Sequence, residues 1–432
     1  MPGRAAEPTV HPMPATSTPA PATTRKLRPR AVLHASGGPR YAVALAVDAL
    51  GTGLLRPFLL LYGVTVLGLS ASATGLAMTA GIVTGLLSTP GVGRWLDRGA
   101  RSTVVAASML VRVLGTAVLV ATPAGRVWPF AAAALLLGIG NQAWPAAHAA
   151  LVATLSHGRE RDTALAAGRA LRNAGLGAGA LLAMACLAGG TSALRALAAV
   201  TGLAYLAAAG LVWSVRVRAE REPARPAAAA GHGDAPPRMR ALLAANVVYV
   251  FCLNVPEIAL PLVLLTQLHA SPVWSAAVFV ANTVLVVTLQ VPVTVLMSRY
   301  ARRTALAVAG AVLAASYAGF LAVTSLGGGE GAGWAAPAVA AVSVVCTLGE
   351  IVYAGSATAL VTALAPPRVL GRTLARFELS TGFGLAVSPA AITGLAPHGP
   401  AALWGTLAGA TLLSAAAVAA ERDAEEPAQG VQ

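Results

Sequence analysis

Long apolar runs dominate this sequence and constrain its fold more than any other feature. A helix needs about 20 apolar residues to cross a bilayer, and runs of that length recur from residue 41 to residue 420, separated by clusters of Gly, Pro or Arg. They lack the alternating pattern of a membrane β-strand. We expect twelve spans, near 41–64, 73–92, 103–122, 128–155, 164–188, 193–215, 240–266, 273–297, 304–326, 334–364, 371–395 and 400–420. With 56% hydrophobic and only 11% charged residues, the composition also indicates an all-α membrane protein.

The net charge of +14 would suggest a nucleic-acid partner in a soluble protein. Here the distribution of the basic residues gives another explanation. If both termini are cytoplasmic, most of the 30 basic residues fall on cytoplasmic segments, and only Arg126 and Arg195 fall on outer loops. This is the asymmetry expected when positive loops stay inside. We therefore predict a multi-pass protein of the inner or plasma membrane, with both termini cytoplasmic and no nucleic-acid partner.

Three segments are too polar, or too rich in Pro, Ala and Gly, to belong to spans. Residues 1–38 cannot bury enough apolar surface to fold and are expected to form a disordered cytoplasmic tail. Residues 216–239 read as a flexible cytoplasmic linker, and residues 421–432 as a second cytoplasmic tail. The linker divides the spans into an N-terminal six-helix bundle at 39–215 and a C-terminal one at 240–420.

The two halves share an internal repeat. A shift of 209 residues aligns Gly138–Leu155 with Thr347–Leu364, so that Gly140 meets Gly349. The same shift continues through the next loop and into the next span. Chance matches are common between helices rich in Ala and Leu, but one shift that serves a span, a loop and a second span indicates two halves built on one plan.

A short charged loop, Gly93–Arg101, separates the second and third runs. Its order of glycine, aspartate four residues later, a basic residue, glycine and further basic residues resembles the signature of the major facilitator superfamily, although Ala100 stands where the signature has a later glycine. The resemblance covers about residues 40–420. It implies two pseudo-symmetric six-helix bundles with substrate near the midplane between them. The equivalent loop of the second half, Ser298–Arg303, keeps its arginines but has no aspartate.

The resemblance also implies a cytoplasmic gate around this loop. Asp97 is expected to dock near Gly371–Thr373, where the free N–H groups and the dipole of a helix start favour an anion. Arg98 and Arg101 are expected to pair with nearby acids, and the missing second aspartate predicts that the latch is one-sided. The predicted gate residues are Gly93, Asp97, Arg98, Arg101, Glu160 and Asp162.

Ionisable groups inside a bilayer are costly, so each is a functional hypothesis. Asp48, Thr52 and Arg56 recur every four residues and form one stripe on span 1. Asp48 and Arg56 are two turns apart and cannot pair, so Asp48 needs a partner elsewhere; Arg112 is the other clearly mid-span cation. Asp48 is either a proton carrier or one member of a structural ion pair, and the sequence leaves both interpretations open.

Two further acids are candidates for proton coupling. Glu350 follows Gly349 in an element similar to the Gly-Glu pair in span 10 of drug/proton antiporters of this superfamily, which implies a proton or substrate contact. The alternative is a glutamate that is hydrogen-bonded to a neighbouring helix and holds it in place. Glu257 follows Pro256, which frees a backbone carbonyl in span 7, so this position is a hinge, a site, or both. The proton-coupling candidates are thus Asp48, Glu350 and Glu257.

Span 5 carries the small-residue pair Gly175 and Gly179, which predicts close helix packing. The pair resembles the antiporter motif of this superfamily, but Ala180 replaces its usual proline. Arg169 and Arg172 lie near the predicted cytoplasmic edge of the same span, where such side chains are expected to extend toward the interface.

Polar and aromatic residues on otherwise apolar helices are expected to line a substrate cavity. His148 lies one turn beyond Trp144, so both can point the same way. The predicted cavity residues are Thr52, Arg56, Arg112, Asn141, Trp144, His148, Tyr249, Asn254, Asn282, Gln290 and Tyr353. The cysteines lie singly and predict neither a disulfide nor a metal site, and the sequence has no phosphate-binding loop for ATP.

The sequence therefore predicts a secondary transporter, most like the twelve-span drug/proton antiporters. We expect proton-coupled efflux of a small hydrophobic or amphipathic drug or metabolite by alternating access, through a monomer without cofactor or metal. An apolar lining favours such cargo over sugars, whose hydroxyl groups need more polar partners. Nutrient uptake by proton symport and a non-transporting sensor or scaffold remain alternatives. An enzyme would need a convergent catalytic cluster, and the sequence suggests none.

Overall fold

The computed structural model describes residues 36–186, 189–215, 217, 239–327 and 333–425. The predicted tails and linker (1–38, 216–239 and 421–432) lie outside these residues except at their edges. Within the described part every regular element is helical, which confirms the all-α prediction. Ten helices are long and apolar enough to cross a membrane, and two further 29-residue helices, α6 and α7, lie among them.

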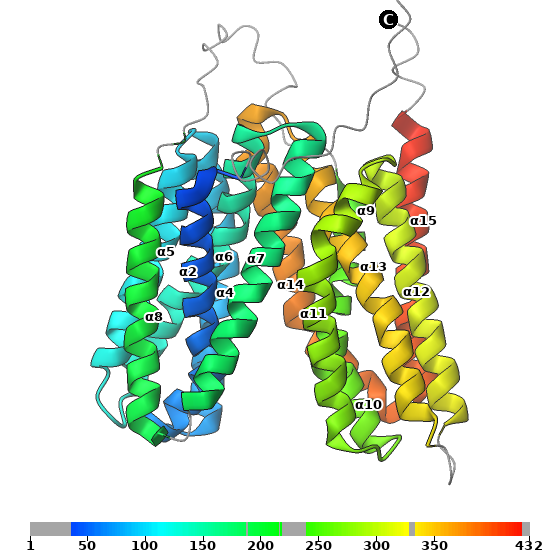
Figure 1. The fold of residues 1–432 in the computed structure, drawn as a ribbon, viewed down its shortest axis with the longest axis horizontal. Coiled ribbons are helices and arrows are strands. Elements are labelled where there is room, and N and C mark those ends of the chain that lie inside the picture. Colours follow the sequence, from blue (N-terminus) through cyan, green and yellow to red (C-terminus); the bar gives the residue numbers. More distant parts are fainter. Residues whose placement is uncertain (1–35, 187–188, 216, 218–238, 328–332, 426–432) are drawn as a thin grey trace, which may run out of the picture.

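The helices form two bundles (Figure 1). The long helices of the N-terminal bundle are α2 (Gly38–Leu55), α4 (Ala71–Asp97), α5 (Arg101–Ala121), α6 (Val127–Leu155), α7 (Gly158–Cys186) and α8 (Gly190–Trp213). The C-terminal bundle contains α9 (Arg240–Tyr249), α10 (Leu260–Thr266), α11 (Pro272–Met297), α12 (Arg302–Leu326), α13 (Ala335–Leu364), α14 (Leu370–Leu395) and α15 (Thr406–Glu425). This is the predicted architecture of two six-helix halves.

Spans 1 and 7 are the irregular ones. Span 1 passes from α2 through η1 (Arg56–Phe58), α3 (Leu59–Leu61) and η2 (Tyr62–Val66). Span 7 passes from α9 through η6 (Val250–Asn254) and η7 (Val255–Ala259) into α10. Each break contains a proline, Pro57 in span 1 and Pro256 in span 7. Proline lacks an N–H and clashes with the preceding turn, so the backbone re-forms its hydrogen bonds with 3₁₀ and π spacing.

Two helices extend further than their apolar runs. The predicted loop Gly93–Arg101 is mostly helical, because α4 continues to Asp97 and α5 begins at Arg101. The turn between them contains Gly99 at φ 86°, a conformation that suits glycine. Helix α7 begins at Gly158 instead of the predicted 164. Hydropathy records only the apolar part of a helix, and charged turns can continue it beyond the hydrocarbon.

Glycines set the closest helix approaches within the N-terminal bundle. A Cβ at Gly175 would lie 2.6 Å from the Cβ of Ala49, and one at Gly179 would collide with the main chain of α2 at Leu50. The pair predicted to pack helices therefore seats α7 directly on the backbone of α2.

In the part of the chain that the structure describes, the two bundles contact each other from one end to about the middle of the helices, where Gly177 of α7 meets Thr283 of α11. We call this end, at which α2 begins and α15 ends, the terminal face, and the opposite end the distal face. The ribbons lie together at the terminal face and diverge toward the distal face (Figure 1). Contacts between α4 and α14, and between α7 and α11, join the bundles.

Candidate functional site

Asp48, on α2, lies at the centre of a buried charge cluster in the N-terminal bundle. Its Oδ1 lies 2.5 Å from Nη2 of Arg112 on α5, and its Oδ2 lies 3.3 Å from Nη1 of Arg172 on α7. The partner that Asp48 needed is thus a pair of guanidinium groups. Arg172 does not extend to the membrane edge as predicted, because α7 begins earlier and places this residue 14 positions inside the helix.

The environment of Arg112 explains how a fully buried guanidinium is satisfied. It donates to Oγ1 of Thr52 at 3.4 Å and lies 4.5 Å from the ring centre of Tyr205, whose hydroxyl also donates to Thr52 at 3.2 Å. A Cβ at Gly140 would collide with the Arg112 side chain, so this glycine leaves room for it. The cavity prediction missed Tyr205, although this residue is an aromatic residue in an otherwise apolar span. Of the predicted stripe, Asp48 and Thr52 are buried, whereas Arg56, which follows the last residue of α2 and begins a 3₁₀ turn, is exposed.

Trp144 and His148 point the same way, as their spacing predicts. Their rings stack at 4.9 Å with 4° between the planes, and Nδ1 of His148 lies 2.9 Å from the hydroxyl of Tyr41. Arg172 lies 4.0 Å from the Trp144 ring centre, a cation–π contact. Both aromatic rings are buried in the N-terminal bundle. They support the charge cluster rather than presenting free faces to a substrate.

Glu350 has a different environment in the C-terminal bundle. Asn282 on α11 donates to Oε2 of Glu350 at 2.9 Å and to Oγ1 of Thr347 at 3.1 Å. Among the described residues no cation forms an ion pair with Glu350, and the side chain is only partly buried. The neighbouring Gly349 packs against Leu313 of α12, where a Cβ would lie 3.0 Å from the leucine side chain. This acid is therefore held by an amide alone.

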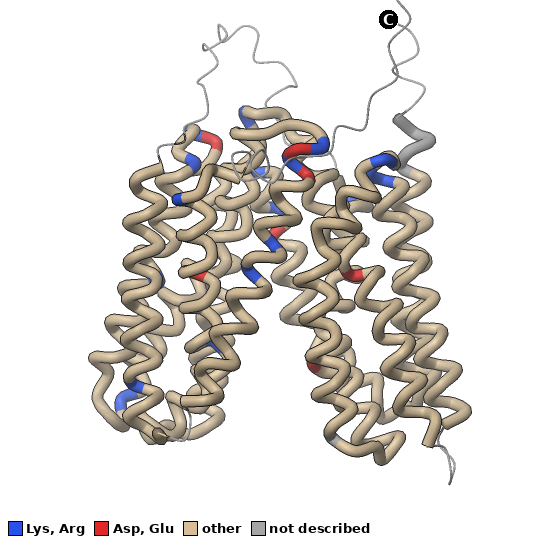
Figure 2. Tube along the Cα trace, in the orientation of Figure 1, with Lys and Arg blue, Asp and Glu red and all other residues tan. Residues whose placement is uncertain are grey.

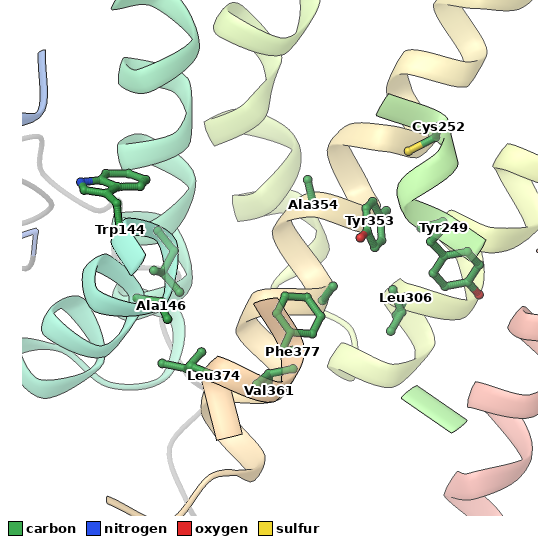
Figure 3. Close-up of a cluster of buried hydrophobic side chains, with 14 of the residues drawn as sticks. Trp144, Ala146, Tyr249, Cys252, Leu306, Tyr353, Ala354, Val361, Leu374 and Phe377 are labelled. Carbon is green, nitrogen blue, oxygen red and sulfur yellow. The ribbon is translucent and has the colours of Figure 1, made fainter. Parts of the chain in front are cut away.

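Tyr353, one turn beyond Glu350 on α13, belongs to a separate polar network. Its hydroxyl donates to Oδ1 of Asn246 on α9 at 2.7 Å. Asn246 in turn donates to the hydroxyl groups of Ser380 and Thr381 on α14, each at 2.9 Å. Figure 3 shows Tyr353 and Trp144 on different bundles. Asn246 is one of two amides in the predicted span 240–266, and the cavity prediction included only the other, Asn254.

Several residues predicted to line a cavity lie inside the C-terminal bundle instead. Tyr249 is buried against Gly310, Asn254 donates to Ser388, and Gln290 donates to the carbonyl of Ile351 at 3.3 Å. Polar atoms in an apolar helix need partners, and the amide N–H groups of Asn254 and Gln290 find them within their own bundle. The buried hydroxyl of Tyr249 has no hydrogen-bond partner in the described structure. Asn141, partly buried on α6, has an Oδ1 without a hydrogen-bond partner in the described structure.

Arg56 and Glu257 are exposed charges in the interior of spans 1 and 7, away from the exposed Arg40 and Arg240 near the starts of these spans. Neither takes part in an ion pair within the described residues. Most of the charged residues lie toward the terminal face (Figure 2).

At the terminal face, Asp97 caps the start of α14. Its Oδ1 accepts from the main-chain N–H of Gly371 at 2.6 Å, and its Oδ2 lies 2.7 Å from Nε of Arg372. The carboxylate thus lies within the segment where the resemblance implies docking, at the positive end of a helix. A Cβ at Gly93 would lie 2.9 Å from the Gly371 carbonyl, so this glycine permits the close approach.

The expected partners of Arg98 and Arg101 are wrong. Arg101 donates to the main-chain carbonyl of Pro367 at 3.3 Å, and Asp162 pairs with Arg302 at 2.8 Å. Arg98 and Glu160 are exposed and form no ion pair in the described structure. The start of α7 faces the C-terminal bundle, so its acid meets an arginine from that bundle and not one from its own.

The latch is also not one-sided, contrary to the sequence prediction. The 209-residue shift places Asp162 on Gly371, and Arg302 begins α12 as Arg101 begins α5. The second half therefore has an equivalent contact in which the loop supplies the cation and the opposing helix start supplies the anion. Further contacts between the bundles join Arg161 to the Thr362 carbonyl at 3.1 Å, Arg159 to Ser298 at 3.0 Å and Arg169 to Thr358 at 3.2 Å.

Comparison with solved structures places this geometry among transporters. The human organic anion transporter MFSD10 (TETRAN) superposes with a TM-score of 0.69 at 16% identity, covering 90% of this chain and 100% of that one. A bacterial homologue of the iron transporter ferroportin in the outward-facing state gives 0.71 at 11% identity, with 88% and 98% covered. FucP, a transporter in the outward conformation, gives 0.64 at 14% identity, with 88% and 95% covered.

At such low identities the TM-scores show a shared fold and no more. A search of curated protein sequences finds no significant match. The sequence profile of the Major Facilitator Superfamily, however, matches residues 41–347, more than half of the chain. The two bundles, the Asp97 contact and this match agree: the chain belongs to the Major Facilitator Superfamily.

Proposed function

We propose that this transporter works by alternating access and couples proton movement to the efflux of a small hydrophobic or amphipathic compound. The observation that supports proton coupling is the contrast between the environments of two interior acids. Asp48 is held by Arg112 and Arg172, whereas Glu350 is hydrogen-bonded only to an amide among the described residues. A carboxyl without a fixed counter-charge can gain and lose a proton without breaking an ion pair.

Asp48 is less suited to this role. Its protonation would leave Arg112, which is fully buried, without its anionic partner, and such a loss is strongly destabilising. We therefore assign Asp48 to holding α2, α5 and α7 together, and Glu350 to carrying the proton. The efflux direction rests on the resemblance of Gly349-Glu350 and of the Gly175/Gly179 pair to elements of drug/proton antiporters.

The test is dye transport in proteoliposomes, with ethidium and a panel of further amphipathic fluorescent dyes as probes. Wild-type protein should move at least one dye faster when a proton gradient is imposed. Glu350→Gln, which keeps the shape and the Asn282 contact, should lose the response to the gradient while retaining exchange of dye for dye. Thr347→Val, which removes the other Asn282 acceptor, is the matched control and should keep the response.

Gradient-driven transport that persists in Glu350→Gln would remove this residue from the proton path. Equal wild-type rates with the gradient present and collapsed would rule out proton coupling altogether. In vesicles with one protein orientation, antiport moves the dye against the direction of proton flow, whereas symport moves it in the same direction. The direction of dye movement therefore separates efflux by antiport from uptake by symport, and the same fold allows both.

A further inference from the structure

Arg56 and Glu257 are opposite charges placed at matching breaks in the two bundles. Arg56 begins η1 and precedes Pro57; Glu257 lies in η7 and follows Pro256. The backbone leaves α-helical geometry at both positions. Each residue therefore occurs where its span changes from one helical segment to another, away from the straight helices that form the bundle cores.

The positions are also equivalent in the repeat. In this earlier part of each half the shift is 201 residues, eight fewer than the 209 that relates Gly138–Leu155 to Thr347–Leu364: it carries Arg101, the first residue of α5, onto Arg302, the first residue of α12. The same shift carries Arg56 onto Glu257. The pseudo-two-fold relation between the bundles thus places a cation in one half opposite an anion in the other.

Their exposure indicates which surface they face. Both side chains are exposed although they lie within spans. A charge within a span that faced lipid would be strongly unfavourable, so these groups face the water-accessible side of the bundles, where the halves diverge. Arg56 lies eight residues beyond Asp48, about 12 Å further toward the distal face along a helix.

Arg56 and Glu257 are not joined to each other, because no ion pair in the described structure includes either residue. The terminal face, in contrast, is closed by its set of polar contacts between the bundles. The bundles are thus joined at the terminal face, whereas the opposite charges of Arg56 and Glu257, toward the distal face, do not form an ion pair in the described structure.

We infer that Arg56 and Glu257 form an ion pair that closes the distal face when the terminal face opens. This inference rests on the proposed alternating access, because only a rocking motion of one bundle against the other would bring spans 1 and 7 together. It reassigns both residues: Arg56 from the substrate cavity and Glu257 from proton coupling to a distal gate. The proline-containing breaks give each span a point at which it can bend to make the contact.

The experiment measures the distance between spin labels at Ser72 and Val273, two exposed positions near the distal starts of α4 and α11. An Asp97→Ala background weakens the terminal face so that the distal-closed state becomes populated. With the native charges, a second and shorter distance should appear. Arg56→Glu alone, or Glu257→Arg alone, should reduce that population by at least about fivefold, the lower range of typical coupling between sites.

The reversed double variant, Arg56→Glu with Glu257→Arg, should restore the short distance. Arg195→Glu reverses another exposed charge near the distal face and is the matched control; it should leave the population unchanged. A short population that the single reversals leave intact, or that the double reversal fails to restore, would overturn the gate while leaving alternating access in place. If no short distance appears in any variant, alternating access itself fails, and the gate with it. Each variant is first checked for an unchanged elution profile.

Discussion

At the scale of single residues, the interior charges divide into those that hold the fold and those that remain available. Asp48 is fully enclosed by two guanidinium groups, and Tyr205 and Thr52 complete the environment of Arg112. Glu350, Arg56 and Glu257 form no ion pair in the described structure. The sequence identified Asp48 and Arg112 as candidates, since any mid-span charge stands out. It could not identify Arg172 as the second partner for two reasons. Hydropathy placed the start of α7 at residue 164 instead of Gly158, and the spacing of residues along one helix does not show which neighbouring helix each face meets.

Removal of one member of the Asp48 cluster is expected to be costly. Asp48→Leu leaves the guanidinium groups of Arg112 and Arg172 without their anion and should lower the free energy of unfolding by about 3–5 kcal/mol. The double variant Asp48→Leu/Arg112→Leu removes one of these two unpaired cations and should recover part of the loss. Denaturant unfolding of the protein in detergent, followed by tryptophan fluorescence, measures both. A double variant no more stable than Asp48→Leu would contradict the structural role assigned to Asp48.

At the scale of elements, apolar length predicts where helices cross but not where they end. The predicted runs match the cores of the described helices. The helices α4 and α7 nevertheless extend past their apolar runs into charged turns, and the predicted loop Gly93–Arg101 is largely helix. The polar partners found between helices, such as Asn246 with Tyr353, depend on how each helix is rotated in its bundle. That rotation follows from packing between distant segments, which one sequence does not specify.

Packing of α7 on α2 through glycine gives a prediction at this scale. Gly179→Leu would force a side chain into the main chain of α2 at Leu50, and overpacking of this kind typically costs about 1–3 kcal/mol. Gly210→Leu, on the exposed side of α8 with nothing within 4 Å of its added Cβ, is the matched control and should leave stability unchanged. Thermal unfolding in detergent compares the two. Equal melting temperatures would mean that α7 can move off α2 at little cost.

At the scale of the whole molecule, the terminal face joins the bundles through two related contacts of opposite polarity. The contact of Asp97 with Gly371 and Arg372 resembles the expected gate. The ion pair of Asp162 with Arg302 is its counterpart in the other half. The family resemblance predicted the first contact; the second was missed because the loop of the second half has no aspartate, so a search for the same residue type could not find it. The geometry of a helix start facing a loop is retained although the charges are exchanged.

This counterpart predicts a rescue by charge reversal. Asp162→Arg places two cations together and should increase the population open at the terminal face by about fivefold or more. The additional change Arg302→Asp should restore closure. Spin labels at His157 and Tyr300, exposed on opposite bundles at this face, report the opening as a longer distance. Failure of the reversed pair to restore the short distance would show that the contact does not hold the bundles together.

The chemistry of the terminal face also makes the two bundles unequal targets for mutation. Asp97, Arg101 and Arg161 all reach main-chain groups of the C-terminal bundle, at Gly371, Pro367 and Thr362. The main-chain carbonyls of Pro367 and Thr362 survive almost every substitution of their residues, whereas each side chain that reaches them is lost in a single step. Gly371 is the exception, because a side chain there would collide with the carbonyl of Gly93. Spontaneous variants that leave this face unlocked will therefore accumulate in the N-terminal half of the gene, even though the joint belongs equally to both halves of the protein.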